Sequence, residues 1–286
     1  MTLFFSILIG LLSMVSYSLA GALSKPLSHK LGVAQILFLR GSAVIVLLGI
    51  ATFTSFHYFQ HWITVLLTIG LGMAGYLPVL AFTKGIKNSP LGIVSPIAST
   101  SPLITVFLSF LFLKIQIRPL QWVAILLVIL TNIVVSIDLK NWRQSKLFQK
   151  SSGIPYALMA ALGWGLCFFL LVPATKILSP LLAAFLLEVG VTIAAGLHIK
   201  LSSQKVEFKN ALSPSVMFNG ILIGIGTVAF TVGVQYFNIG IIQVLSNSGA
   251  LATTLLGAYL YHERLHLKER IATIMMVAGV IALFLV

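Results

Sequence analysis

Of the 286 residues in this chain, 59% are apolar and only 8% are charged, and the mean hydropathy is +1.08. A soluble domain carries charge on about a quarter of its residues, so this composition excludes a water-exposed fold and indicates a membrane protein. The net charge is +13, but Lys and Arg stand between apolar runs and form no basic run interleaved with aromatics, which argues against nucleic-acid binding.

Ten apolar runs follow one another along the chain, and each is close to the roughly 20 residues that one membrane-spanning helix needs. They cover residues 3–23, 33–53, 62–83, 91–112, 119–137, 154–172, 180–198, 215–236, 240–260 and 268–286. The first run has no basic region before it and no persuasive cleavage site, so we interpret it as a spanning helix and not as a removed signal. The predicted fold class is an all-α membrane protein with ten transmembrane helices.

Two segments of the chain, residues 85–120 and 233–268, match each other without a gap at a constant shift of 148 positions. The same shift places Phe82 on Phe230. Duplicated halves of this kind are typical of secondary transporters. Because each half holds five predicted spans, which is an odd number, the two halves must enter the membrane in opposite directions, as an inverted repeat.

The predicted organisation is a first five-helix repeat over residues 1–137, a linker over 138–152 and a second five-helix repeat over 153–286. Lys and Arg gather at one set of corners, which includes the linker, and the side of a membrane protein that is richer in these residues is the cytoplasmic one. We therefore expect a cytoplasmic linker, both termini outside the cytoplasm, and a multi-pass protein of a bacterial plasma (inner) membrane.

Several short motifs stand in the predicted spans or at the corners between them. They are Ala161-Leu162-Gly163-Trp164-Gly165, His262-Glu263-Arg264-Leu265, Gly279, Pro102 and Arg40. In these motifs each half resembles the EamA module of the drug/metabolite transporter superfamily, over nearly the whole chain. The halves also depart from each other, since the first reads Lys114-Ile115-Gln116-Ile117 where the second has its Glu-Arg-Leu corner.

The resemblance implies two inverted five-helix EamA-like repeats around a central cavity lined by spans one, three, four, six, eight and nine. Similar proteins are ten-span carriers for amino acids, nucleotide sugars, other metabolites or drugs. They act mostly as exporters, and several are coupled to protons. The resemblance therefore implies a transporter but does not name its substrate.

Uncharged polar side chains inside the spans are the first candidates for this cavity. Gln243 and Asn247 share one face of span nine, Gln235 lies in span eight and Ser99 in span four. An amide left without partners in hydrocarbon costs several kcal/mol, which favours a place on a polar cavity for the three amides. For the serines and glycines in the same spans, tight helix packing is the favoured interpretation. We expect the second half to supply most specific polar contacts.

Aromatic side chains well inside the spans form a second group of candidates, namely Tyr17, Tyr76 and Trp164. Their rings can stack on a substrate ring or cation. Trp and Tyr also anchor helices at the membrane interface, but these three lie away from the predicted span ends.

Two ionisable residues lie within predicted spans, Glu188 in span seven and Arg40 in span two. Charge inside a membrane is costly, so each is a functional candidate by default. Burial disfavours the charged form of Glu188, which would suit a group that loads and releases a proton; the alternative is a structural partner for a backbone amide or for Arg40. Arg40 could bind a substrate carboxylate or extend to the cytoplasmic interface.

Pro78, Pro96 and Pro102 lie inside spans three and four, where a proline breaks the helical ladder and permits a bend. We interpret them as candidate hinges, and a static kink is the alternative. The histidines have no metal-ligand spacing, and the single cysteine, Cys167, rules out a disulfide within the chain and a Cys-based metal site. We expect no metal and no cofactor.

The sequence favours a secondary active transporter of small organic metabolites that works by alternating access. We expect an amino acid or related solute as substrate, efflux as the direction of transport, and coupling to protons. The partners would be the substrate, the lipid bilayer and protons, with no nucleic acid, and the protein would be a monomer or homodimer. A channel-like facilitator and an integral-membrane enzyme are the alternatives. No repeated ring of one charge sign suggests a channel filter, and four of the five acidic residues lie at corners, away from any catalytic cluster.

Overall fold

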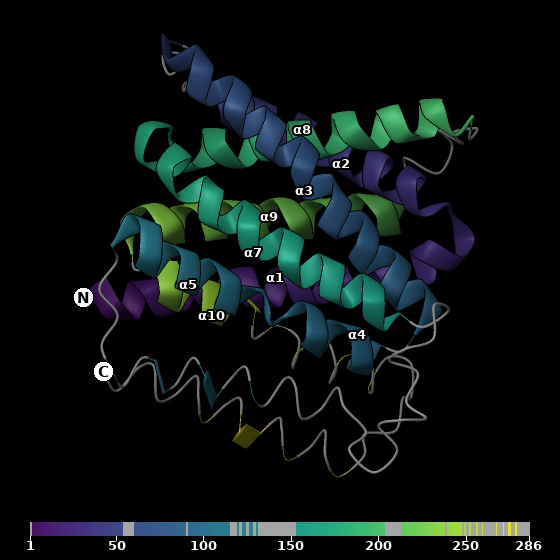
Figure 1. The fold of residues 1–286 in the computed structure, drawn as a ribbon. Helices are drawn as coiled ribbons and strands as arrows, with labels where there is room; N and C mark the ends of the chain where they lie inside the picture. The colour runs from purple at the N-terminus through teal and green to yellow at the C-terminus, as the bar shows by residue number, and fades with distance from the viewer. Residues whose placement is uncertain are drawn as a thin grey trace.

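The computed structural model describes residues 2–53, 60–89, 91–114, 153–203, 213–237 and 239–247, together with scattered positions between 119 and 130 and between 249 and 278. The regular elements in this part of the chain are helices (Figure 1). They are α1 (Thr2–Lys30), α2 (Val33–Ala51), α3 (Trp62–Asn88), α4 (Leu91–Ala98), α5 (Ser101–Leu113), α7 (Ile154–Ile177), α8 (Pro180–Leu201), α9 (Pro214–Tyr236) and α10 (Ile239–Asn247).

Six of these helices are long and apolar enough to cross a membrane, namely α1, α2, α3, α7, α8 and α9. They correspond to predicted spans one, two, three, six, seven and eight. Predicted spans five and ten, and the later part of span nine, lie almost wholly outside the described residues. The predicted all-α membrane fold is therefore confirmed, whereas the count of ten spanning helices is not.

Helices α1 and α3 are longer than predicted, because they continue beyond residues 23 and 83 through polar residues to Lys30 and Asn88. Each contains a proline in its interior, Pro26 in α1 and Pro78 in α3. Charge at the end of an apolar run thus does not mark where the helix ends.

Predicted span four, residues 91–112, is not one helix but two. Helix α4 ends at Ala98 and α5 begins at Ser101, and both the amide and the hydroxyl of Thr100 donate to the carbonyl of Ile97, at 3.1 and 2.8 Å. Pro102 explains the break, because its ring has no N–H to donate and would clash with the carbonyl four residues earlier, at Ala98.

The helix contacts follow the repeat, with α7, α8 and α9 in the places that α1, α2 and α3 take in the first half. Helix α1 packs against α9 and α10, just as α7 packs against α3 and against α4 and α5. Helix α8 packs against α3 as α2 does against α9, and the α2–α8 contact joins two equivalent helices. Exchanging the halves thus leaves this pattern of neighbours unchanged, as expected for a two-fold relation between them.

Helices α3 and α8 cross with their backbones in contact, at a glycine from each helix. A Cβ atom on Gly72 would overlap the backbone oxygen of Leu187, and one on Gly190 would overlap the backbone oxygen of Ile69. Small residues at such crossings let membrane helices approach closely, so van der Waals contact between the helices is maximal there. The crossing fixes the position of α8, which carries Glu188, against the first half.

We expect Gly190→Ala to destabilise the protein by about 1–3 kcal/mol, because the added methyl forces the two backbones apart. Gly70→Ala is the matched control on α3, since nothing lies within 4 Å of a Cβ at that position. Alanine is favoured over glycine in an open helix, so the control should keep or raise the thermal unfolding temperature in detergent. Equal unfolding temperatures for the two variants would contradict the close crossing.

Candidate functional site

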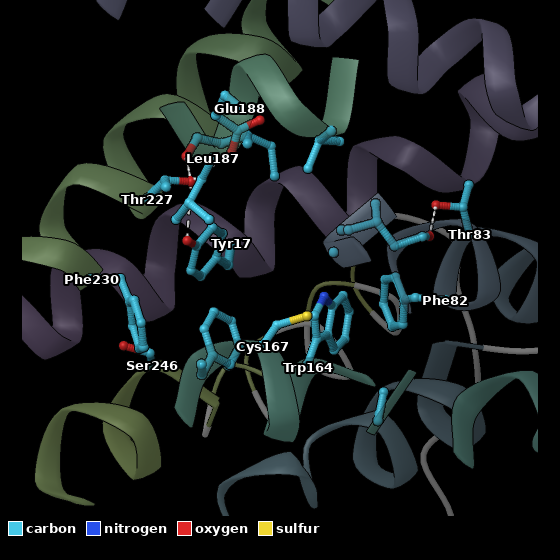
Figure 2. A pocket seen from close by; sticks show the side chains of 18 of the residues that line it. Tyr17, Phe82, Thr83, Trp164, Cys167, Leu187, Glu188, Thr227, Phe230 and Ser246 are labelled. Atoms are coloured by element: carbon cyan, nitrogen blue, oxygen red, sulfur yellow. Dashed lines mark hydrogen bonds between the residues drawn. The ribbon is translucent and has the colours of Figure 1, made fainter. Parts of the chain in front are cut away.

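A cavity of about 200 Å³ lies between the two halves of the protein. Helices α1, α2, α3, α4, α7, α8, α9 and α10 all contribute to its wall (Figure 2). The wall is mostly apolar, and its polar and charged side chains are Tyr17, Ser18, Ser24, Arg40, Thr83, Ser95, Ser99, Trp164, Cys167, Glu188, Thr227 and Ser246. A concave, largely apolar space with a few polar groups is the usual form of a small-molecule site.

Two aromatic pairs form much of the apolar wall. The ring centroids of Phe82 and Trp164 lie 5.3 Å apart, and those of Phe168 and Phe230 lie 4.6 Å apart. Phe82 and Phe230 occupy equivalent positions in the two repeats, on α3 and α9, and each packs against an aromatic residue of α7. Figure 2 shows Trp164 beside Phe82, and Phe230 on the opposite side of Cys167 from them.

Glu188 lies on α8, is 7% exposed and lines the cavity. The hydroxyl of Thr227 on α9 lies 3.0 Å from its Oε1, and the hydroxyl of Tyr17 on α1 donates to Thr227 Oγ1 at 3.1 Å. Both contacts are drawn in Figure 2. The carboxyl group is therefore held by a hydrogen-bonded chain that joins three helices, and its alternative role as a partner of a backbone amide has no support in these contacts.

Arg40 lies on α2, is also 7% exposed and lines the same cavity. Its Nη1 donates to Asn219 Oδ1 on α9 at 3.5 Å. Asn219 is fully buried and donates through Nδ2 to the carbonyl of Ala20 at 2.7 Å and to Ser24 Oγ at 3.2 Å. The guanidinium thus lies on the cavity wall and donates to Asn219, which favours the cavity over the membrane interface as its location.

Asn219 is a residue that the sequence did not single out. It stands near the beginning of predicted span eight, where a polar side chain is compatible with the membrane interface. The cost of burying an amide, which drew attention to the glutamines, applies to Asn219 as well and is the signal that would have found it.

Arg40 and Glu188 occupy equivalent positions in the two repeats, since the shift of 148 residues places one on the other. Helices α2 and α8, which carry them, pack together. Each side chain is held through α9 to α1, one by Asn219 and the other by Thr227. The cavity therefore presents a basic and an acidic side chain at two equivalent places.

Five of the residues predicted for the site lie together on the cavity wall. They are Tyr17, Arg40, Ser99, Trp164 and Glu188. The polar residues of the wall come from both halves, and not mainly from the second half as expected. The side chain of Asn247 lies outside the described residues.

Three predicted cavity residues lie elsewhere. Tyr76 is 4% exposed, belongs to a hydrophobic cluster with Leu37 and Ala195, and its hydroxyl makes a 2.5 Å hydrogen bond with His198 Nδ1 on α8. Gln243 is fully buried within α10, and Gln235, near the end of α9, has a buried Oε1 with no hydrogen-bond partner among the described residues. Tyr76 is directed at α2 and α8, which the sequence spacing alone does not reveal.

The proposed hinge prolines have different surroundings. Pro102 is the second residue of α5, directly after the break in predicted span four. Pro78 lies inside continuous α3 and packs against α7, where a Cβ on Gly163 would meet its ring at 2.8 Å. Pro96 lies within α4, and its side chain lies outside the described residues. Within the described part of the chain, no group of three or more His, Cys, Asp and Glu side chains could hold a metal ion.

Comparisons with known proteins agree with this architecture. The model of the EamA-like transporter family matches twice, at residues 4–137 and 151–285. A solved structure described as "Crystal structure of protein" is similar in fold, with a TM-score of 0.72 and 20% sequence identity over 98% of this chain and 96% of its own. No curated protein matches the chain.

We expect Asn219→Leu to lower the free energy of unfolding by about 1–3 kcal/mol, because Arg40 and the carbonyl of Ala20 lose a buried hydrogen-bond partner. Thermal unfolding in detergent measures the loss. Thr231→Val is the matched control, because Thr231 is equally buried on α9 and its hydroxyl donates to carbonyls of its own helix, at Thr227 and Val228. If Asn219→Leu unfolds at the same temperature as the control, Asn219 does not support Arg40.

Proposed function

We propose, since the chain belongs to the EamA-like transporter family, that it is a secondary active transporter that moves small organic metabolites across the membrane by alternating access. The cavity between the two halves supports this proposal, because both repeats supply its wall and both supply a charged residue to it. In carriers built from duplicated halves, the substrate binds between the repeats, and the repeats move against each other.

The proposed architecture is ten transmembrane helices in two inverted repeats, over residues 1–137 and 153–286, joined by a cytoplasmic linker over 138–152. The exchange symmetry of the helix contacts supports a two-fold relation between the repeats. The Lys and Arg distribution supports termini outside the cytoplasm. The break before Pro102 supports this proline as a hinge of the first half.

The substrate that fits this cavity best is a zwitterion with an apolar or aromatic body, such as an amino acid. The single observation that carries this assignment is the presence of Arg40 and Glu188 on one cavity wall, at equivalent positions of the two repeats. A guanidinium binds a carboxylate through paired N–H donors, and a carboxylate binds an ammonium. The aromatic pairs at Trp164 and Phe230 provide the surface for the apolar body.

Coupling to protons and export are the proposed mode of transport. Glu188 is buried, faces the cavity and has a hydroxyl partner, so it can change its charge at the place where the substrate binds. A buried acid inside a membrane protein is typical of a proton relay. The protein would act in a plasma membrane as a monomer or homodimer.

A thermal-shift screen of the purified protein against amino acids, amines and nucleosides tests the substrate class. We expect apolar and aromatic amino acids to stabilise the protein, by about 2.7 kcal/mol when the ligand is present at about a hundred times its Kd. Glu188→Gln and Arg40→Met should each abolish the stabilisation, whereas Thr231→Val, which changes a residue away from the cavity wall, should retain it. Stabilisation that survives both cavity substitutions would overturn the assigned site.

Transport of a stabilising amino acid into proteoliposomes, measured with and without a pH gradient, tests the coupling. The wild type should respond to the gradient, and Glu188→Gln should lose that response because its amide cannot take up or release a proton in this pH range. Trp164→Leu should weaken transport while the response to the gradient remains. A Glu188→Gln variant with the wild-type rate and the wild-type pH dependence would remove Glu188 from the mechanism.

A further inference from the structure

The hydroxyl of Thr227 lies within hydrogen-bond distance of three oxygen atoms. Glu188 Oε1 is 3.0 Å from Thr227 Oγ1, the carbonyl oxygen of Ile223 is 2.9 Å away, and the hydroxyl oxygen of Tyr17 is 3.1 Å away. A hydroxyl group has one proton to donate and two lone pairs that accept. Thr227 can therefore donate to Glu188 or to Ile223, but not to both at once.

These contacts satisfy Glu188 in its ionised form. Thr227 then donates a hydrogen bond to the carboxylate and accepts one from the hydroxyl of Tyr17. The hydrogen bonds therefore run in one direction, from Tyr17 through Thr227 to Glu188. Each hydroxyl in this series of hydrogen bonds has an acceptor, and the negatively charged carboxylate of Glu188 accepts a hydrogen bond from Thr227 on α9.

The same positions also satisfy Glu188 in its protonated form. A proton that arrives from the cavity forms an O–H bond at Oε1, and the net charge of the side chain changes from negative to neutral. The new carboxyl O–H donates to Thr227 Oγ1, while Thr227 rotates its own proton to the carbonyl of Ile223. Thr227 then uses both lone pairs, for Glu188 and for Tyr17, and the heavy atoms keep their places.

We propose that Thr227 is the positioning residue that lets Glu188 take up and release a proton without a change of conformation, by reversing the direction of its own hydrogen bond. This inference rests on the proposed proton coupling and adds to it the group that makes the proton site reversible. The first half has no such group, because the equivalent position on α3 is Val79, which also lines the cavity, and the residue equivalent to Glu188 is Arg40.

The titratable and charged side chains on the helices around Glu188 do not prevent it from taking up and releasing a proton. Arg40 from α2 lines the same cavity and is hydrogen-bonded to Asn219, and Tyr17 from α1 belongs to the chain itself. On α3, Tyr76 is paired with His198. Helix α9 carries no Asp, Glu, Lys, Arg or His, and α7 supplies Cys167 to the cavity wall.

Infrared difference spectroscopy of the full-length protein in liposomes, recorded between alkaline and acidic buffer without any substrate, tests the inference. The carbonyl stretch of a protonated carboxyl reports both its titration and its hydrogen bonding. The difference between the wild type and Glu188→Gln isolates the band of Glu188 from those of the other acidic residues. We expect Thr227→Val to shift the frequency of this band and the pH of its appearance, and Thr227→Ser to retain both.

Two further variants keep the test decisive. Tyr17→Phe removes the donor at the other end of the chain and should also shift the band, whereas Thr231→Val, a hydroxyl deletion on the same helix, should leave it unchanged. A band in Thr227→Val with the wild-type frequency and titration would overturn the role of Thr227 while the proton site stands. Absence of any band that Glu188→Gln removes would overturn the proton site itself, and with it this inference.

Discussion

Lipid offers no hydrogen bonds, so every polar group below the membrane surface must find its partner inside the protein. This constraint accounts for the arrangement of the cavity wall more directly than any other. Arg40 is held by Asn219, Glu188 by Thr227, and both partners are connected to α1. The charged residues thus bind α1, α2, α8 and α9 together at the place where a substrate would have to pass.

The duplication makes the arrangement of the helices symmetrical, and the differences between the two copies determine the chemical character of the cavity wall. The helix neighbours are preserved when the halves are exchanged, and the aromatic residues Phe82 and Phe230 are conserved in type between the repeats. At the position of Arg40 and Glu188, however, the charge is reversed. A symmetrical scaffold can thus present an oriented site, because a substrate with two unlike ends distinguishes one half from the other.

The parts of the fold that could be predicted from sequence are those that depend on composition and periodicity. Runs of apolar residues located six spanning helices, and the cost of a charge in the membrane identified Arg40 and Glu188. The break at Thr100 was missed, because a proline within an apolar run is compatible with either a kink or a new helix. The direction of a side chain was the least predictable property. Tyr76 and Gln243 are buried among neighbouring helices and not on the cavity, since spacing gives a face but not the neighbour of that face.

The interruption between α4 and α5 has a mechanical consequence. With 13 residues, α5 is about 20 Å long, which is too short to cross a hydrocarbon core of about 30 Å without α4. Ser95, Ala98 and Ser99, at the end of α4 and in the break, belong to the cavity wall. The break between the two short helices therefore lies at the cavity wall. We propose that bending at this break reshapes the cavity wall while the hydrogen-bond ladder within α4 and within α5 stays whole, so that a local movement alters access to the cavity.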